Sequence, residues 1–590
     1  AGTSFDKAEQ SFSEAQNSLG FLNSKENVSV IKEKTVDSVS NLLEAAQNIS
    51  AAGSSFATGI NNLKTLPSQF IEANKSSFNP ELAPQKNGPS LTDKLKNDLV
   101  KIDEAIADVA KAQENLNNVD AQSIPANLRD NLQKAKDQLA KLNTVIQETR
   151  SQIPAILKLL GDRYPHRYLI LLQNDTEARP TGGFIGSYLI VDINDGYITK
   201  NEFHDVYESD GQLQEEIKAP EDISSITKNW RMRDSNYSPD FPISAEKAAW
   251  FLQKEKGPSV DSVIAINQHF IGDLLADLGQ VKLDSLKAPL TKDNYQLVLT
   301  YLIESKLSGK DDPKKVLREL IPAFQRSLLD QGNFVNLLKS FHKAILEKDI
   351  IFYSRDQEVQ SLFDKLGLTG RQISIQPGSD YLQVTATSIG GNKSDAFIQQ
   401  TLLHNTFVDQ QGTVTDEITI DRKHTWTEKD LEFWRSELKK FGYSEISESV
   451  KDIMGRGQNK AIIKVYVPQG TVLKNVVGTS ADNVKIREDA ELNKTYFMFE
   501  MDVYPSNESV VTLRYELPKK LNIVPTDTYR LNYQVQPGLF KTNFIKKIIT
   551  NTGLSIIKEY PETLTKKDDG SAIFSQEIKQ DGYLSALISN

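Results

Sequence analysis

Apolar residues recur at intervals of three and four along much of residues 1–160, which is the period of a helix that buries one face. One stripe in LTDKLKNDLVKIDEAIADVAKAQENL consists of Leu91, Leu95, Leu99, Ile102, Ile106, Val109 and Leu116. After NNVDAQSIP a second stripe consists of Leu128, Leu132, Ala135, Leu139, Leu142, Ile146 and Ile153. Two stripes joined by a short turn predict an antiparallel helical hairpin. Pro125 suits the first turn of the second helix, because a backbone N–H at that position would have no hydrogen-bond partner within the helix.

Residues 5–63 show a weaker version of the same pattern, and SSFNPELAPQKNGPS (76–90) has the composition of a linker. We therefore expect residues 1–160 to form a helical, coiled-coil-like stalk or hairpin region that packs on itself. A binding arm is the alternative, because such stripes specify helix packing without naming the partner.

The pattern changes at about residue 164, where the runs become short and apolar on both faces. RYLILLQ, GFIGSYLIVDI and YITKNEFHDV read as strands, and NDG between the last two is a two-residue hairpin signal. SAEKAAWFLQKEKG, VDSVIAI and HFIGDLLADLG then alternate helix, strand and helix. This alternation predicts a central layered α/β domain over residues 164–370.

After residue 378 short strands dominate, among them YLQVTATS, AIIKVYVP and SVVTLRYEL, with turn signals between them. That rhythm predicts a C-terminal antiparallel β-sandwich over 378–590, interrupted by a helical insertion at 427–458. The aromatic residues in or beside the insertion are expected to dock on the sandwich, with a partner-binding flap as the alternative; they are Trp426, Phe433, Trp434 and Phe441. The predicted fold class is multidomain α+β.

Composition narrows the classes of function. The 590 residues carry a formal net charge of −10, which disfavours a general nucleic-acid role because phosphate neutralisation needs a basic face. There are no cysteines, which excludes disulfides, thiolate nucleophiles and cysteine-ligated metals. The sequence shows no apolar run of about 18 residues, and it starts without a signal-like segment, so we expect a mature or trimmed product whose targeting segment is missing.

Most motif-like stretches read as turns. The six histidines lack zinc-helix spacing. SIGGNKS (388–394) superficially resembles a phosphate loop, but Asn392 stands where a glycine should precede the lysine, and GRGQNK lacks the third glycine of a dinucleotide loop. No catalytic residue, metal ligand or cofactor is assigned from these patterns.

The stretch NDTEARPTGGF (174–184) lies between two predicted strands and combines residues suited to ligand contact. Paired glycines let another group approach the main chain, and Arg179 offers a planar fork for carboxylate or phosphate. Asn174, Asp175 and Glu177 could accept hydrogen bonds or help to hold a hard cation. The competing interpretation is a structural turn in which Arg179 pairs internally with Glu177 or with an acid from another segment.

The second such stretch is NWRMRDSNYSPDFPISAEKAAW (229–250). Arg231 and Arg233 project to the same side if the chain is extended, and Ser244 suits a helix N-cap. The two arginines could bind a diphosphate, or they could fasten the loop in an ion-pair network. The candidate ligand-binding residues of both stretches are Asn174, Glu177, Arg179, Gly182, Gly183, Arg231, Arg233, Asp234, Asn236 and Asp240.

Several stretches together resemble the bacterial envelope family catalogued as domain of unknown function 4012. They include YLILLQNDTEARPTGGFIGSYLIVDINDGYI, WRMRDSNYSPDFPISAEKAAWFL and VDSVIAINQHFIGDLLADLGQVKL, in this order, and later VYVPQGTVL and VTLRYELP. The resemblance covers roughly residues 160–540. It implies one N-terminal membrane helix, a helical spacer and a large domain outside the cytoplasm, and it implies no activity.

VDSVIAINQHFIGDLLADLGQVKL is also similar in layout to a segment of the LytR–CpsA–Psr envelope enzymes, which transfer glycopolymers from a polyprenyl-diphosphate carrier. That similarity would assign the diphosphate and a magnesium ion to Arg179, Arg231, Arg233 and Asp234. The signatures of those enzymes do not occur here in matching form, so this is an analogy of fold alone.

We therefore expect a membrane-tethered, extracytoplasmic bacterial cell-envelope or surface protein that binds or organises envelope material or partner proteins without turnover. Its partners would be an envelope polymer or a surface protein, and the membrane through a helix absent from this chain. No cofactor is expected. The alternative is a phosphotransferase acting on lipid-diphosphate-linked glycopolymers, and magnesium would be needed only in that case.

Overall fold

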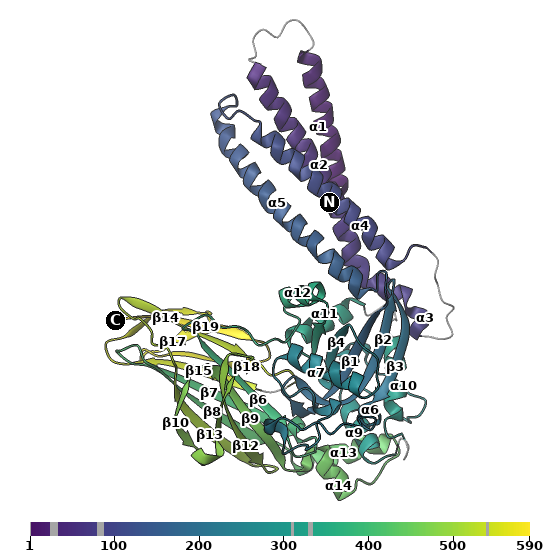
Figure 1. The fold of residues 1–590 in the computed structure, drawn as a ribbon, viewed down its shortest axis with the longest axis vertical. Coiled ribbons are helices and arrows are strands. Elements are labelled where there is room, and N and C mark those ends of the chain that lie inside the picture. Colours follow the sequence, from purple (N-terminus) through teal and green to yellow (C-terminus); the bar gives the residue numbers. More distant parts are fainter. Residues whose placement is uncertain (1, 24–32, 79–87, 308–311, 329–333, 539–541) are drawn as a thin grey trace. The chain divides into compact units, whose positions relative to one another are not determined.

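Figure 1 shows a computed structural model of the chain. The structure describes residues 2–23, 33–78, 88–307, 312–328, 334–538 and 542–590. The fold is mixed α+β, with helices in the N-terminal part and sheets in the C-terminal part, as the sequence predicts. The chain divides into two compact units: Ala1–His166 with Asp192–Lys200, and Arg167–Val191 with Asn201–Asn590. None of the helices in the described ranges is both long and apolar enough to cross a membrane.

The first unit is built mainly from long helices. They are α1 (Gly2–Asn23), α2 (Glu33–Ala73), α3 (Lys75–Phe78), α4 (Leu91–Asn117) and α5 (Ala126–Leu159). The two apolar stripes provide much of the shared core of α4 and α5, including Ile102, Val109, Leu139 and Ile146. Arg150 pairs with Asp103 and Lys96 with Asp162, so the two helices run antiparallel, as predicted. Most of the predicted linker (76–90) lies outside the described residues.

A five-stranded sheet follows, in the order β3-β2-β1-β4-β5. Its strands are β1 (His166–Arg179), β2 (Gly182–Asn194), β3 (Tyr197–Asp205), β4 (Ser262–Asn267) and β5 (Ile350–Ser354). The NDG signal is confirmed: Asp195 and Gly196 join β2 to β3 with positive φ angles of 52° and 82°. β1 and β4 are parallel, from Tyr168 opposite Ser262 to Gln173 opposite Asn267, and β5 runs antiparallel to β4.

Helices cover both faces of this sheet because alternate side chains of a strand point to opposite faces. Val263 and Ala265 belong to a core that includes residues of α7 (Phe241–Lys254). Ile264 and Ile266 pack against the core of α8 (Gln268–Leu278) and α9 (Tyr295–Glu304). The remaining helices of this region are α10 (Lys315–Leu328), α11 (Phe334–Leu346) and α12 (Gln357–Lys365).

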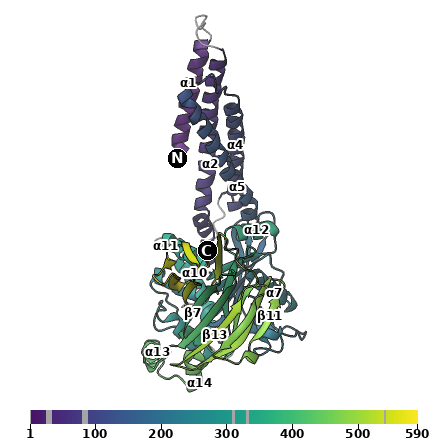
Figure 2. The same ribbon diagram turned by 90° about the vertical axis from the view of Figure 1, so that its left-hand side faces the viewer.

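Two seven-stranded sheets form the C-terminal part, seen from two directions in Figure 1 and Figure 2. One sheet contains β10 (Val472–Val477), β13 (Glu508–Glu516), β8 (Val414–His424), β7 (Ile398–Val408), β15 (Thr542–Thr550), β18 (Ala572–Ile578) and β17 (Thr565–Lys566). The other contains β11 (Lys485–Asp489), β12 (Lys494–Val503), β9 (Asn459–Pro468), β6 (Asp380–Ser388), β14 (Thr526–Gln534), β19 (Gly582–Ser589) and β16 (Ser555–Tyr560). Their inward residues, such as Val465 and Ile418, share one hydrophobic core. We refer to them as the two-sheet region.

The prediction of wholly antiparallel pairing is wrong. β15 is parallel to β7 and β14 is parallel to β6, so each sheet is mixed. These pairs join strands more than a hundred residues apart in sequence. The alternation of apolar and polar residues reports which face of a strand is buried but not the direction of its neighbour.

The predicted helical insertion is present as α13 (Glu428–Lys440), α14 (Glu448–Lys451) and η4 (Asp452–Arg456). Its aromatic residues do not dock on the two-sheet core, which corrects the prediction. Trp426, Trp434 and Phe441 belong to the core of α8 and α9, and the Tyr301 hydroxyl of α9 donates to the carbonyl of Glu445 at 2.9 Å. The insertion therefore completes the hydrophobic core of the α/β region.

Candidate functional site

The two stretches singled out from the sequence meet in space. Arg179 is the last residue of β1, and Asp234 ends the short helix η2 (Met232–Asp234). The Arg179 Nη2 atom lies 3.5 Å from an Asp234 carboxylate oxygen and 3.3 Å from one of Glu177. The stretches at 174–184 and 229–241 thus form one locus at the end of β1.

Arg179 fastens this locus to the two-sheet region. Its side chain is only 3% exposed and donates to the carbonyl oxygens of Ala178 and Ser388, both at 3.1 Å. In return, the Gln536 amide donates to the Arg179 carbonyl at 2.7 Å, and the Ala178 N–H donates to Asp395 at 3.0 Å. The guanidinium is therefore engaged by internal partners, as the structural interpretation of this stretch predicted.

The arginines of the second stretch are also bound internally. Arg231 donates to the backbone carbonyls of Asp210 and Leu213 at 3.0 and 3.1 Å. Arg233 pairs with the Asp210 carboxylate at 2.9 Å and with Asp234 at 3.5 Å. Both therefore reach the end of α6 (Val206–Asp210) and hold the loop of the second stretch against it.

The paired glycines admit neighbouring groups of the chain itself. A Cβ on Gly182 would lie 2.0 Å from Oδ1 of Asn267, and a Cβ on Gly183 would lie 2.0 Å from the carbonyl carbon of Asn174. The Asn236 amide donates to the Gly183 carbonyl at 2.9 Å. The close approach predicted from the glycines is confirmed, and these neighbours are Asn174 and Asn267.

Asp240 has a local structural role in the second stretch. It is the N-cap of α7 and accepts from Ile243 N–H at 3.4 Å and from Gln372 N–H at 3.0 Å. The prediction of Ser244 as the N-cap is wrong. Pro242 fits the first turn of the helix, so the helix begins earlier, and the Ser244 hydroxyl donates to the carbonyl of Ser238.

A cavity of about 510 Å³ opens beside this locus, at the carboxyl ends of the parallel strands β1 and β4. Ligands of open α/β sheets bind at this end of the strands. Its apolar wall comes from Leu172, Phe184, Ile266, Ile271, Leu299, Ile303, Leu317, Leu320, Ile321 and Ile453. Of the predicted residues, Asn174 and Glu177 line it.

Charged side chains from distant parts of the chain also line the cavity. Lys393 pairs with Glu177 at 2.9 Å and with Glu304 at 3.7 Å, and Lys314 pairs with Asp205 at 2.8 Å. Burial alone raises the pKa of Glu177, but Lys393 and Arg179 outweigh it and bring that pKa below its ordinary value. Glu177 is therefore a carboxylate at neutral pH.

The pKa values of Lys314 and Lys393 are shifted in opposite directions. Burial lowers the pKa of Lys314, although Asp205 opposes the shift. For Lys393 burial also acts to lower the pKa, but Glu177 and Glu304 reverse it and the pKa is raised. The cavity thus combines an apolar wall with paired charges rather than a surplus of one sign.

The sequence interpretation missed these lysines. Lys393 lies in SIGGNKS, which is a turn, as predicted. Its ammonium donates a hydrogen bond to the Glu177 carboxylate. Lys314 directly follows Pro313 ahead of α10. Neither position shows a local signal of a site, because the cavity is assembled from segments more than a hundred residues apart.

Two regions of the described chain bring acidic and histidine side chains to the spacing of metal ligands, and in the first region His269 belongs to two such groups, one of them with Asp273 and Glu347. Asp175, His269 and Asp349 approach one another at the same edge of the five-stranded sheet. Asp380, His404 and Asp416 do so inside the two-sheet core. This last group surrounds Lys546, whose ammonium lies 3.0 Å from Nδ1 of His404, so a cation is already built into it.

Residues 164–301 match a family model described as "Protein of unknown function (DUF4012)". No curated protein matches the chain. Among solved structures, protein lpg2210 of Legionella pneumophila aligns with a TM-score of 0.24 and 8% identity, over 36% of this chain and 73% of that one. The Lin1025 protein of Listeria innocua aligns with a TM-score of 0.20 and 12% identity, over 37% of this chain and 85% of that one. An M1 zinc metallopeptidase of Deinococcus radiodurans aligns with a TM-score of 0.17 and 10% identity, over 32% of this chain and 42% of that one. These TM-scores support no functional argument, and none of these comparisons supports the similarity to LytR–CpsA–Psr enzymes.

Proposed function

Through residues 164–301 the chain belongs to the DUF4012 family of proteins of unknown function, and on that premise we propose that it binds an amphipathic ligand of the bacterial cell envelope without turning it over. The observation that carries this proposal is the cavity of about 510 Å³ at the carboxyl ends of β1 and β4. Ligand sites in proteins are typically concave and mostly apolar, with a few polar groups that orient the ligand.

The lining suggests the kind of ligand. The apolar wall suits an acyl, isoprenoid or similar chain. The acidic and basic side chains balance, three of each: Glu177, Asp205 and Glu304 against Lys306, Lys314 and Lys393. A cavity without formal net charge favours an uncharged or zwitterionic polar head, such as a sugar, over a strongly anionic one.

Binding without catalysis accords with the environment of the arginines. Transfer from a lipid diphosphate would need cationic groups free to contact phosphate oxygens. Arg179, Arg231 and Arg233 already donate to acids and carbonyl oxygens of the chain. We therefore assign them to holding the two stretches together and leave ligand contact to the cavity.

The proposed setting is the outside of the cytoplasmic membrane, with the protein tethered to it, and with an envelope polymer or a surface protein as partner. It is supported by the envelope family that the sequence resembles and is compatible with the lack of cysteine. In this proposal residues 1–160 act as a coiled-coil-like stalk, 164–370 as the ligand-binding domain and 378–590 as a β-sandwich.

Binding of dodecyl maltoside below its micellar concentration, followed by native mass spectrometry and calorimetry, tests the function. We expect one molecule to bind, and maltose, which lacks the chain, not to bind. Thr300→Trp places a large ring in the cavity wall and should weaken binding by about tenfold or more. Leu366→Trp, at an exposed position 55% accessible to solvent, is the matched control and should bind as the wild type does.

Absence of binding to the wild-type protein would overturn the proposal. So would undiminished binding by a correctly folded Thr300→Trp variant, because the ligand would then occupy another place. Circular dichroism of each variant distinguishes loss of the cavity from loss of the fold.

A further inference from the structure

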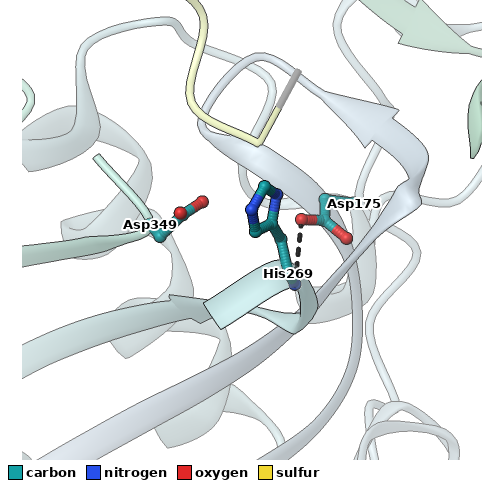
Figure 3. Close-up of side chains that lie close together, drawn as sticks. All are labelled: Asp175, His269 and Asp349. Atoms are coloured by element: carbon teal, nitrogen blue, oxygen red, sulfur yellow. Dashed lines mark hydrogen bonds between the residues drawn. The ribbon is translucent and has the colours of Figure 1, made fainter. Parts of the chain in front are cut away.

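We propose that Asp175, His269 and Asp349 form a binding site for one first-row divalent cation, separate from the ligand cavity. One oxygen or nitrogen atom from each residue lies within 4.8 Å of the others. Figure 3 shows the imidazole of His269 between the two carboxylates. An ion shared by three such ligands is a common arrangement for a protein-bound transition metal.

The topology of the sheet brings these residues together. Asp175 lies near the carboxyl end of β1, His269 follows the carboxyl end of β4, and Asp349 directly precedes β5. β1 and β4 are parallel and β5 is antiparallel to β4, so all three positions fall on the same edge. The Asn267 N–H, which donates to the Asp349 carbonyl at 2.8 Å, fixes that junction.

Both carboxylates are buried, and Lys343, the lysine that pairs with Asp273 and Glu347, also acts electrostatically on Asp349 from beyond ion-pair distance. Asp175 is 2% exposed and Asp349 is 3% exposed. Neither takes part in an ion pair with a lysine or arginine within the described part of the chain. The Oδ2 atom of Asp175 accepts from the His269 N–H at 3.1 Å, and its Oδ1 atom is buried with no hydrogen-bond partner. A buried carboxylate of this kind is costly unless it is neutralised, and a bound cation would neutralise it.

Space for an ion exists beside these residues. A cavity of about 20 Å³ lies next to Asp175 without being lined by it; its lining is His269, Glu347, Asp349, Val535, Gln536, Gly538 and Lys579, and the Lys579 ammonium pairs with Glu577 at 3.5 Å. That volume is sufficient for one water molecule or one ion. Gly538 has a φ of +75°, and a Cβ there would lie 2.9 Å from the Asp175 Cβ, so a larger residue would crowd the site.

The neighbouring acids differ in a way that identifies the ligands. Asp273 and Glu347 also approach His269, but Lys343 lies 2.5 Å from Asp273 and 3.6 Å from Glu347. Lys343 therefore already neutralises Asp273 and Glu347, and these two acids would surround the ion without binding it directly. Two carboxylates and one imidazole favour Mn²⁺, Fe²⁺ or Zn²⁺ over Ca²⁺, which prefers oxygen ligands alone.

The test uses the whole chain, freed of metal by chelation and dialysis and then titrated with Mn²⁺ and Zn²⁺ separately. Calorimetry and elemental analysis should give one ion per chain, and the melting temperature should rise with bound ion. Asp175→Asn and His269→Ala should each weaken binding by about tenfold or more. The control His342→Ala changes an exposed histidine of α11 and should bind normally.

Asp175→Asn has a second signature. The substitution removes an unpaired buried charge, so the metal-free variant should melt no lower than the metal-free wild type. Adding metal should not raise the melting temperature of the variant. The proposal is overturned if the wild type takes up no ion, or if the folded Asp175→Asn and His269→Ala variants bind as well as the wild type. Dodecyl maltoside binding is measured separately, so either proposal can fail without the other.

Discussion

Single residues of the locus act mainly by pairing charges that the fold buries. Arg179 has Glu177 and Asp234 as partners and is held in place by carbonyl oxygens of two regions. The sequence left two interpretations of Arg179 open, which were internal pairing with Glu177 or another acid and contact with a ligand. It could not identify Asp234 or Ser388 as the partners, because that choice depends on contacts made after the chain folds.

Arg179→Met should strongly destabilise the protein. The substitution leaves the buried carboxylates of Glu177 and Asp234 with fewer partners, and breaking a buried ion pair from one side costs about 3 kcal/mol or more. Urea denaturation would measure the change. Arg371→Met, which removes a 46% exposed partner of Asp364, should change the free energy of unfolding by less than about 1 kcal/mol. Equal effects of the two substitutions would contradict a locking role for Arg179.

Glu255 and Asp210 form another buried pair beside the second stretch. Oε2 of Glu255 and Oδ1 of Asp210 are both buried without a hydrogen-bond donor, which one shared proton would supply. Burial, and then the neighbouring Asp210 charge, raises the pKa of Glu255 to about 8. Because this pKa lies above the unfolded value, the pair stabilises the fold at low pH and loses that effect as the pH rises through about 8.

Glu255→Gln should therefore flatten the pH dependence of stability. The amide of glutamine can donate permanently to Asp210, so it needs no proton. Differential scanning fluorimetry from pH 6 to pH 9.5 should show the melting temperature of the wild type falling and that of the variant falling less. Glu562→Gln, at an exposed position, should follow the wild type. A parallel fall in all three proteins would refute the shared proton.

Elements were predictable where their signals are local. The stripes of α4 and α5, the turn at Asp195–Gly196 and the alternation of strands and helices after residue 164 all appear in the structure. The parallel strand pairs and the core that receives Trp434 were not predictable. They depend on which distant element becomes a neighbour, and periodicity reports burial without naming the partner.

The β1–β2 hairpin gives an element-scale prediction at Gly183. Its Cβ position lies 2.0 Å from the carbonyl carbon of Asn174, and backbone of the adjacent strand cannot move aside as a side chain can. Gly183→Ala should cost about 4 kcal/mol or prevent folding. Gly279→Ala, with φ +78° and open space around it, should cost about 1 kcal/mol. Thermal unfolding compares them, and similar melting temperatures would show that the hairpin can separate.

At the scale of the molecule, the α/β region is not complete within residues 164–370. The core of α8 and α9 includes Trp426, Trp434 and Phe441, which follow β8 of the two-sheet region in sequence. The end of β1 is also bound to Asp395 and Gln536. The cavity needs the same later segments, since Lys393 and Ile453 line it. A site of this kind could not be predicted from 174–184 and 229–241 alone.

A fragment of residues 164–370 should consequently fail to fold, whereas a fragment of residues 164–590 should fold and unfold in one transition. The shorter fragment would expose the apolar faces of α8 and α9, which the three aromatic side chains of the insertion cover, and burying one such side chain contributes about 2 kcal/mol. Near-ultraviolet circular dichroism and urea denaturation would compare the two. Cooperative unfolding of the shorter fragment would mean that the insertion merely rests on a core that is stable without it. If only the longer fragment folds, its binding of dodecyl maltoside would show whether the cavity works without the helical unit.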